Sequence, residues 1–96
     1  PIEDIKELEE DSEVKIKGTI SNIINTEKMA IIEVSDKNDS ISVILFKDGE
    51  MSLEKGLNIE VQGKIREYKG EKEIIADEVR IENFKSPESN QSIDEG

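Results

Sequence analysis

The chain has 96 residues, enough for one small domain with a single core but not for two. It carries 24 acidic and 13 basic residues, a net charge of -11, and only 3% aromatic residues, so any core must be aliphatic. Because Cys and His are both absent, disulfide frameworks, the usual zinc sites and His-dependent catalysis are excluded. We expect no metal, no cofactor and no enzymatic activity in the isolated domain, which leaves open that a larger parent protein is an enzyme.

The first segment is acidic, with a net charge of -6 over residues 1–13, whereas residues 14–81 carry only -2 and residues 82–96 carry -3. The nearly neutral centre of the chain is compatible with a basic stripe on one face of the domain.

Apolar residues at every third position of the N-terminal segment predict one or two helical turns that lay an apolar edge on the domain: Ile2, Ile5 and Leu8. Because the segment lacks the features of a signal peptide and no apolar run approaches the roughly 20 residues of a membrane span, we expect a cytoplasmic location without membrane contact.

Apolar residues alternate with polar ones through the next part of the chain, which predicts strands. The first predicted strand covers residues 13–24, and the second covers 29–35 after a short polar loop. Turn formers at 36–39 then lead to a third strand over 41–46. In the second strand the alternation predicts an inner face of Ala30, Ile32 and Val34 and an outer face of Met29, Ile31, Glu33 and Ser35.

The second half of the chain predicts a short helix and two more strands. Residues 47–55 contain good helix formers and end at Gly56, a natural helix stop. A fourth strand is predicted over 59–68, and a fifth over 74–81 with a bulge near Asp77, where the apolar alternation changes phase. Residues 85–96 lack any such pattern and are predicted to be a flexible linker or tail, which leaves residues 1–84 as the domain.

Five strands with a short helix between the third and the fourth, and glycines within the first and fourth strands, describe an all-β protein with sharply curved strands. We therefore predict a five-stranded Greek-key barrel of the oligonucleotide/oligosaccharide-binding (OB) fold. A helical or ferredoxin-like fold is not favoured, because no helical pattern exceeds about ten residues.

Four sequence motifs resemble one family: Val14-x-Ile16-x-Gly18-x-Ile20, Ile32-x-Val34-x-Asp36, Ile41-x-Val43-x-Leu45-Phe46 and Gly56-x-x-Ile59-x-Val61-x-Gly63-Lys64-Ile65. Over residues 4–82 the chain is similar to nucleic-acid-binding OB domains of the anticodon-binding and helicase type. The same pattern occurs in archaeal single-stranded-DNA-binding proteins related to replication protein A, in class II aminoacyl-tRNA synthetases and in DNA-processing nucleases. The resemblance implies an OB barrel and a nucleic-acid ligand.

In this fold the ligand surface is the exposed face of the second and third strands, flanked by the loops before the second and the fifth. Alternation places these residues on that face: Met29, Ile31, Glu33, Ser42, Ile44 and Phe46. Phe46 is predicted to stack on a base, or alternatively to close the barrel against the short helix. Ile31 and Ile44 are predicted to form either a nucleic-acid platform or a protein contact, because outward strand positions usually favour polar residues.

A second candidate cluster lies on the outer face of the fourth strand and in the loop that follows it: Lys64, Arg66, Tyr68, Lys69 and Lys72. Its cations would follow a phosphate backbone while Tyr68 stacks on a base, and Lys28 and Lys37, in the turns before and after the second strand, would extend the basic track. The alternative is an ordinary solvated strand whose charges pair with neighbouring glutamates.

These features lead to two functional hypotheses. The first is a non-catalytic nucleic-acid-binding module, part of a larger protein, that prefers single-stranded DNA or unpaired RNA. The second is a protein-interaction domain that uses the exposed face of the second and third strands to bind another domain or a protein partner. A continuous positive stripe through Lys28, Lys64, Arg66 and Lys72 would favour the first hypothesis, and its interruption by acidic side chains the second.

Overall fold

The computed structural model describes residues 1–46 and 53–82. Within these ranges the elements, in chain order, are one short helix and five strands: α1 (Ile2–Ile5), β1 (Glu13–Asn25), β2 (Met29–Ser35), β3 (Ser40–Phe46), β4 (Asn58–Tyr68) and β5 (Glu71–Ile81). The predicted range of the second strand is confirmed, and the fifth strand begins three residues earlier than predicted.

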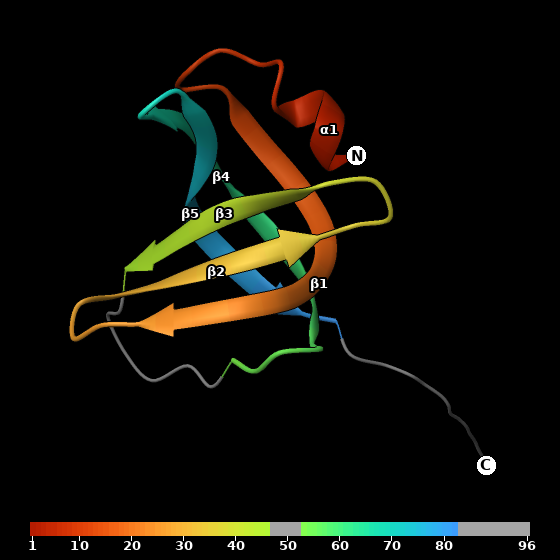
Figure 1. The fold of residues 1–96 in the computed structure, drawn as a ribbon, viewed down its shortest axis with the longest axis vertical. Coiled ribbons are helices and arrows are strands. Elements are labelled where there is room, and N and C mark those ends of the chain that lie inside the picture. Colours follow the sequence, from red (N-terminus) through yellow and green to blue (C-terminus); the bar gives the residue numbers. More distant parts are fainter. Residues whose placement is uncertain (47–52, 83–96) are drawn as a thin grey trace.

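The five strands close into a barrel in the order β1-β2-β3-β5-β4. Neighbouring strands are antiparallel except β3 and β5, which run parallel. The first part of β1 pairs with β4 and its second part pairs with β2, so β1 joins the two sides of the barrel, and β2 and β3 lie in front of β4 and β5 in Figure 1. The predicted all-β, five-stranded barrel is therefore confirmed.

The core is an aliphatic interior to which every strand contributes. Its fully buried side chains occupy the inward positions of the strands: Ile20, Ile32, Val34, Val43, Ile59, Val61, Ile65 and Ile74. Gly18 lies where β1 bends, and a Cβ atom at this position would lie 2.7 Å from the Ser35 carbonyl oxygen. Glycine is needed here because any side chain would prevent the close approach of β1 to β2.

Two β-bulges adjust the register of the barrel. The first lies in β5, where Gln62 pairs with Glu78 but Gly63 pairs with Ala76, so Asp77 is the extra residue, as predicted. The second was not predicted and lies in β1, where Ser21 is the extra residue between Ile20 and Asn22. The second bulge turns the Ser21 hydroxyl toward Glu33 on the outer face.

The N-terminal segment is fixed to the barrel by the turn between β2 and β3. Ile2 is fully buried, and its N–H donates a 2.9 Å hydrogen bond to Asp36 Oδ2. The Lys6 ammonium lies 3.0 Å from Asp39 Oδ1. These contacts confirm the short predicted helix and the inward direction of Ile2, but Leu8 is exposed because α1 ends at Ile5 and the apolar spacing no longer follows a helix.

The hydrogen bonds of this turn change the acidity of two carboxyl groups. Backbone N–H groups of Ile2, Asn38 and Asp39 bond the Asp36 carboxylate and lower its pKa below the usual value. The Lys6 ammonium and the Ser40 N–H bond Asp39 and lower its pKa as well. The ionised forms of both groups therefore hold the N-terminal segment.

Two predicted features fall largely or wholly outside the described residues. Most of the predicted helix over 47–55 lies there, and residues 53–57, which the structure does describe, contain a turn and no helix. The predicted linker over 85–96 and the proposed domain boundary at residue 84 also lie outside the described residues. No helix in the described part of the chain is long and apolar enough to cross a membrane.

Candidate functional site

The outer face of the barrel carries two adjacent rows of paired side chains that cross β1, β2, β3 and β5. The strand register defines an apolar row of Ile24, Ile31, Ile44 and Ile75. It also defines a polar row of Asn22, Glu33, Ser42, Glu73 and Arg66, which continues onto β4. The predicted outward direction of Ile31, Ser42 and Ile44 is therefore correct, and the two rows form one surface.

Exposure varies along the apolar row. Ile24 is 54% exposed and Ile31 is half-buried, whereas Ile44 is only 5% exposed. The predicted exposure of Ile44 is wrong, because this side chain lies at the centre of the row between Ile31 on β2 and Ile75 on β5. A ligand on this face would therefore contact Ile24 and Ile31 more than Ile44.

The apolar surface continues to one end of the β2–β3 hairpin. Met29 and Phe46 are directly paired there, with Met29 half-buried and Phe46 52% exposed. Half of the Phe46 surface is thus accessible to solvent. The alternative prediction, that Phe46 packs against a helix over 47–55, depends mainly on residues outside the described ranges.

Hydrogen bonds hold the Glu33 carboxylate of the polar row. Ser21 Oγ lies 3.3 Å from Glu33 Oε1, and Ser40 Oγ lies 3.3 Å from Glu33 Oε2. The two serines come from the strands on either side of β2, so a hydroxyl donates to each carboxylate oxygen. The prediction placed Glu33 on this face, but only the structure reveals its serine partners.

The β4–β5 hairpin presents an exposed aromatic ring beside two cations. Lys69 and Gly70 both have positive φ, which forms a tight two-residue turn and leaves Tyr68 53% exposed. The Arg66 guanidinium carbon lies 5.8 Å from the centroid of the Tyr68 ring, and the Lys69 ammonium lies 5.3 Å from it. Both distances are within the range of cation–π attraction.

The predicted basic track is interrupted. Arg66 donates from Nε and Nη2 to Glu73 Oε1, at 3.1 and 2.6 Å. The Lys72 ammonium donates to the backbone oxygens of Lys6 and Leu8, at 3.1 and 2.7 Å, so it fixes the N-terminal segment. Among the described residues, the cations of the track that form no ion pair are Lys28, Lys37, Lys64, Lys69 and Lys72.

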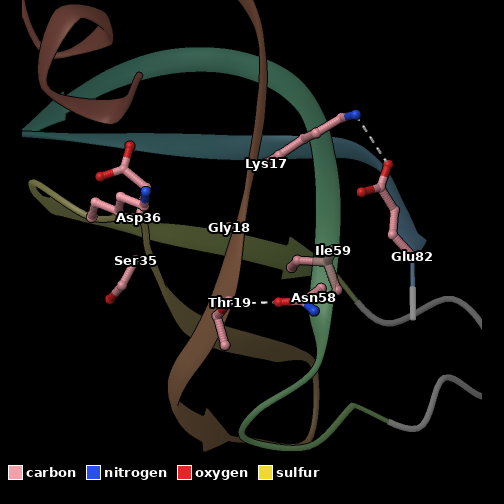
Figure 2. Close-up of a pocket in the computed structure, with 9 residues that line it drawn as sticks. Lys17, Gly18, Thr19, Ser35, Asp36, Asn58, Ile59 and Glu82 are labelled. Carbon is pink, nitrogen blue, oxygen red and sulfur yellow. Dashed lines mark hydrogen bonds and ion pairs between the residues drawn. The ribbon is translucent and has the colours of Figure 1, made fainter. Parts of the chain in front are cut away.

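A pocket of about 540 Å³ lies around Gly18 of β1 (Figure 2). Its walls are Lys17, Gly18, Thr19, Ser35, Asp36, Lys37, Asn58, Ile59 and Glu82. The Lys17 ammonium lies 3.6 Å from Glu82 Oε2, and Thr19 Oγ1 lies 2.7 Å from Asn58 Oδ1. The ion pair and the hydrogen bond thus occupy these four polar side chains. The described residues contain no cluster of three or more metal-ligating side chains.

Comparisons with known proteins agree with this geometry. Residues 14–82 match the model of a family described as an OB-fold nucleic acid binding domain, of the tRNA anticodon type. No curated protein sequence matches the chain.

Solved structures share the barrel. One, of a replication protein A heterotrimer bound to single-stranded DNA, has 16% identity and a TM-score of 0.66 over 72% of this chain and 56% of that one. The structure of the Stn1-Ten1 complex of S. pombe has 26% sequence identity and a TM-score of 0.64, and the match covers 72% of this chain and 57% of that one. The structure of asparaginyl-tRNA synthetase from Pyrococcus horikoshii has 12% sequence identity and a TM-score of 0.66, and the match covers 74% of this chain and 20% of that one. The chain thus spans little more than half the length of the first two proteins.

Proposed function

Because the chain belongs to the family of OB-fold nucleic acid binding domains, we propose that it is a non-catalytic module that binds single-stranded DNA or unpaired RNA. The observation that carries this proposal is the exposed Tyr68 ring, flanked by Arg66 and Lys69 at the end of the β4–β5 hairpin. Stacking on an aromatic ring next to cations is a common way to bind a single strand without sequence preference.

The side chains of the face suggest distinct contributions. Lys28, Lys64 and Lys69 would contact phosphates, because their ammonium groups form no ion pair within the described residues. Tyr68 and Phe46 would stack on bases, and Ile31 would contact a base through its apolar side chain. Three phosphate contacts are few, so we propose binding that depends on salt less steeply than in strongly basic single-strand binders.

A second candidate function, protein interaction, is favoured by two observations. Glu73 neutralises Arg66 and thereby interrupts the positive stripe, and the apolar row leaves Ile24 exposed. Two of the proteins with a similar barrel are described in complexes, one as a heterotrimer and one as Stn1-Ten1. A place within a larger protein, a protein partner and a cytoplasmic location stay predictions.

Fluorescence anisotropy tests the proposal with one labelled sequence as single-stranded DNA, single-stranded RNA and duplex DNA, at about 50 and 200 mM salt. We expect the single strands to bind more tightly than the duplex. Tyr68→Ala should weaken single-strand binding by about 1 to 3 kcal/mol with little change in the salt dependence, because stacking releases no counterions. Tyr68→Phe retains the ring and should bind like the wild type.

Failure of the wild type to bind any single strand at about 50 mM salt would contradict the proposal, because electrostatic attraction is strong under that condition. The apolar row would then be the surface on which to search for a protein partner. Equal losses for Tyr68→Ala and Tyr68→Phe would instead show that the hydroxyl, and not the ring, makes the contact.

A further inference from the structure

Glu33 is an exposed carboxylate on a face that we propose to bind a polyanion. Among the described residues it forms no ion pair, in contrast to Glu73 in the same row, which pairs with Arg66. An unpaired negative charge repels phosphates, so this position opposes binding unless the carboxylate accepts hydrogen bonds from the ligand. The ligand groups that could donate them are the edges of the bases.

The surroundings of Glu33 fix its two oxygens for such a contact. Ser21 and Ser40 reach one oxygen each, at 3.3 Å, from strands on opposite sides of β2. The Ser21 hydroxyl also lies 2.9 Å from Ser35 Oγ and 3.2 Å from the Glu33 carbonyl oxygen. A carboxylate oxygen has two lone pairs, so one serine at each oxygen leaves each with a free acceptor site.

Two free acceptors side by side match a base edge that presents two adjacent donors. The Watson–Crick edge of guanine does so with N1–H and the N2 amino group, whereas adenine, cytosine, thymine and uracil do not present two adjacent donors on that edge. Unstacked bases of a single strand expose this edge to a protein. We propose that Glu33 is a specificity-determining residue that selects guanine in the bound strand, an inference that rests on the proposed function.

The apolar row supports this placement of a purine. Ile31 lies on the same face of β2 two residues from Glu33, a separation of about 7 Å along the strand. Its neighbour Ile24 is directly paired with it and exposed. A guanine ring lying on these two isoleucines would place its Watson–Crick edge toward the polar row, where Glu33 is the acceptor.

The test uses single strands of eleven nucleotides that are thymidine except at the centre, which holds guanine, inosine, 7-deazaguanine or thymine. Inosine lacks only the N2 amino group, and 7-deazaguanine changes only the opposite edge. We expect the guanine and 7-deazaguanine strands to bind about tenfold more tightly than the inosine and thymine strands, the effect of one well-placed bidentate pair.

Variants separate the role of Glu33 from that of its charge. Glu33→Gln should abolish the guanine preference while binding the all-thymidine strand as tightly as the wild type or more tightly, because a repulsive charge is removed. Glu78→Gln makes the same change on β5 outside both rows and should keep the preference. The double variant Ser21→Ala, Ser40→Ala should reduce the preference without weakening binding of the all-thymidine strand, since both serines are positioning residues.

Equal affinity of the wild type for the guanine and inosine strands would overturn the assignment of Glu33 while leaving single-strand binding intact. A guanine preference that persists in Glu33→Gln would overturn it as well. Binding to none of the four strands would overturn both this inference and the proposed function.

Discussion

Isoleucine occurs on both the inner and the outer face of this barrel. Its contribution to the free energy of unfolding differs between the two faces. Ile32 is 0% exposed in the core, whereas Ile24 projects outward from the neighbouring strand. Removing a buried aliphatic side chain costs the transfer free energy of the lost atoms and leaves a cavity, whereas removing an exposed one costs little transfer free energy and leaves no cavity. The two positions therefore form a matched pair.

Ile32→Ala should lower the free energy of unfolding by about 2 to 4 kcal/mol, a large part of the stability of a small domain. Ile24→Ala should change it by less than about 0.5 kcal/mol, because the side chain is on the surface. Urea denaturation followed by circular dichroism measures both. Similar values for the two variants would show that the assignment of inner and outer faces is incorrect.

Sequence alternation was sufficient to place the core residues and most of the candidate face, because the period of a strand determines on which side each residue lies. It was not sufficient for partners that come from distant segments. The Lys72 ammonium binds backbone oxygens more than 60 residues away, and nothing in the local sequence indicates this contact. The burial of Ile44 likewise depends on the parallel pairing of β3 with β5.

At the scale of elements, the N-terminal segment is a short piece of chain fixed by polar contacts from two hairpins. Asp36 and Asp39 bind it from the β2–β3 turn, and Lys72 binds it from β5. A helix of one turn is not stable alone in water, so its docking depends on these bonds and on the burial of Ile2.

This docking should depend on pH. The pKa of Asp36 is lowered in the folded chain by the N–H groups of Ile2, Asn38 and Asp39, so its contribution to stability is present above the unfolded pKa of about 4 and is lost as the pH falls through the lower folded value. Asp36→Asn should be less stable than the wild type at pH 7, and the difference should shrink as the pH falls below about 4.

Thermal unfolding of the wild type and of Asp36→Asn at a series of pH values measures this difference. Glu7→Gln, which removes an exposed charge from the same segment, serves as the control and should show little difference from the wild type at neutral pH. A stability difference for Asp36→Asn that is the same at pH 7 and near pH 2 would contradict the role of the ionised carboxylate.

The two β-bulges show when apolar alternation along a strand predicts a bulge and when the signal is overlooked. A change of phase between Ala76 and Val79 predicted the bulge at Asp77, and the structure confirms it. The same signal exists in β1, where Ile20 is followed by the partly buried Ile23, but the prediction treated this strand as continuous. The missed bulge is the one that directs Ser21 toward Glu33, so the sequence prediction overlooked part of the candidate site.

At the scale of the whole molecule, the net charge of -11 and the few unpaired lysines of the face act on a polyanion in opposite directions. The total charge repels a nucleic acid at a distance and is screened by salt, whereas direct phosphate contacts release counterions. The two effects are separable if one compares variants that have the same net charge.

The triple variant Lys28→Gln, Lys64→Gln, Lys69→Gln should flatten the dependence of log affinity on log salt by about two, at roughly 0.7 for each contact with a single strand. A matched triple variant, Lys15→Gln, Lys17→Gln, Lys55→Gln, removes equal charge from exposed lysines outside the candidate face. We expect its slope to stay near that of the wild type. Anisotropy titrations at four or more salt concentrations give both slopes, and equal flattening would show that no specific lysine contacts exist.

The parallel contact between β3 and β5 is short, with three residue pairs, and it closes the barrel. Two of these pairs, Ser42 with Glu73 and Ile44 with Ile75, also belong to the rows of the candidate face. A ligand that bridges the two strands on this face therefore binds only the closed barrel and shifts the folding equilibrium toward it. At a ligand concentration of one hundred times Kd, this linkage amounts to about 2.7 kcal/mol. Occupancy of the face by such a ligand would thus be thermodynamically coupled to the integrity of the fold through the same few residues.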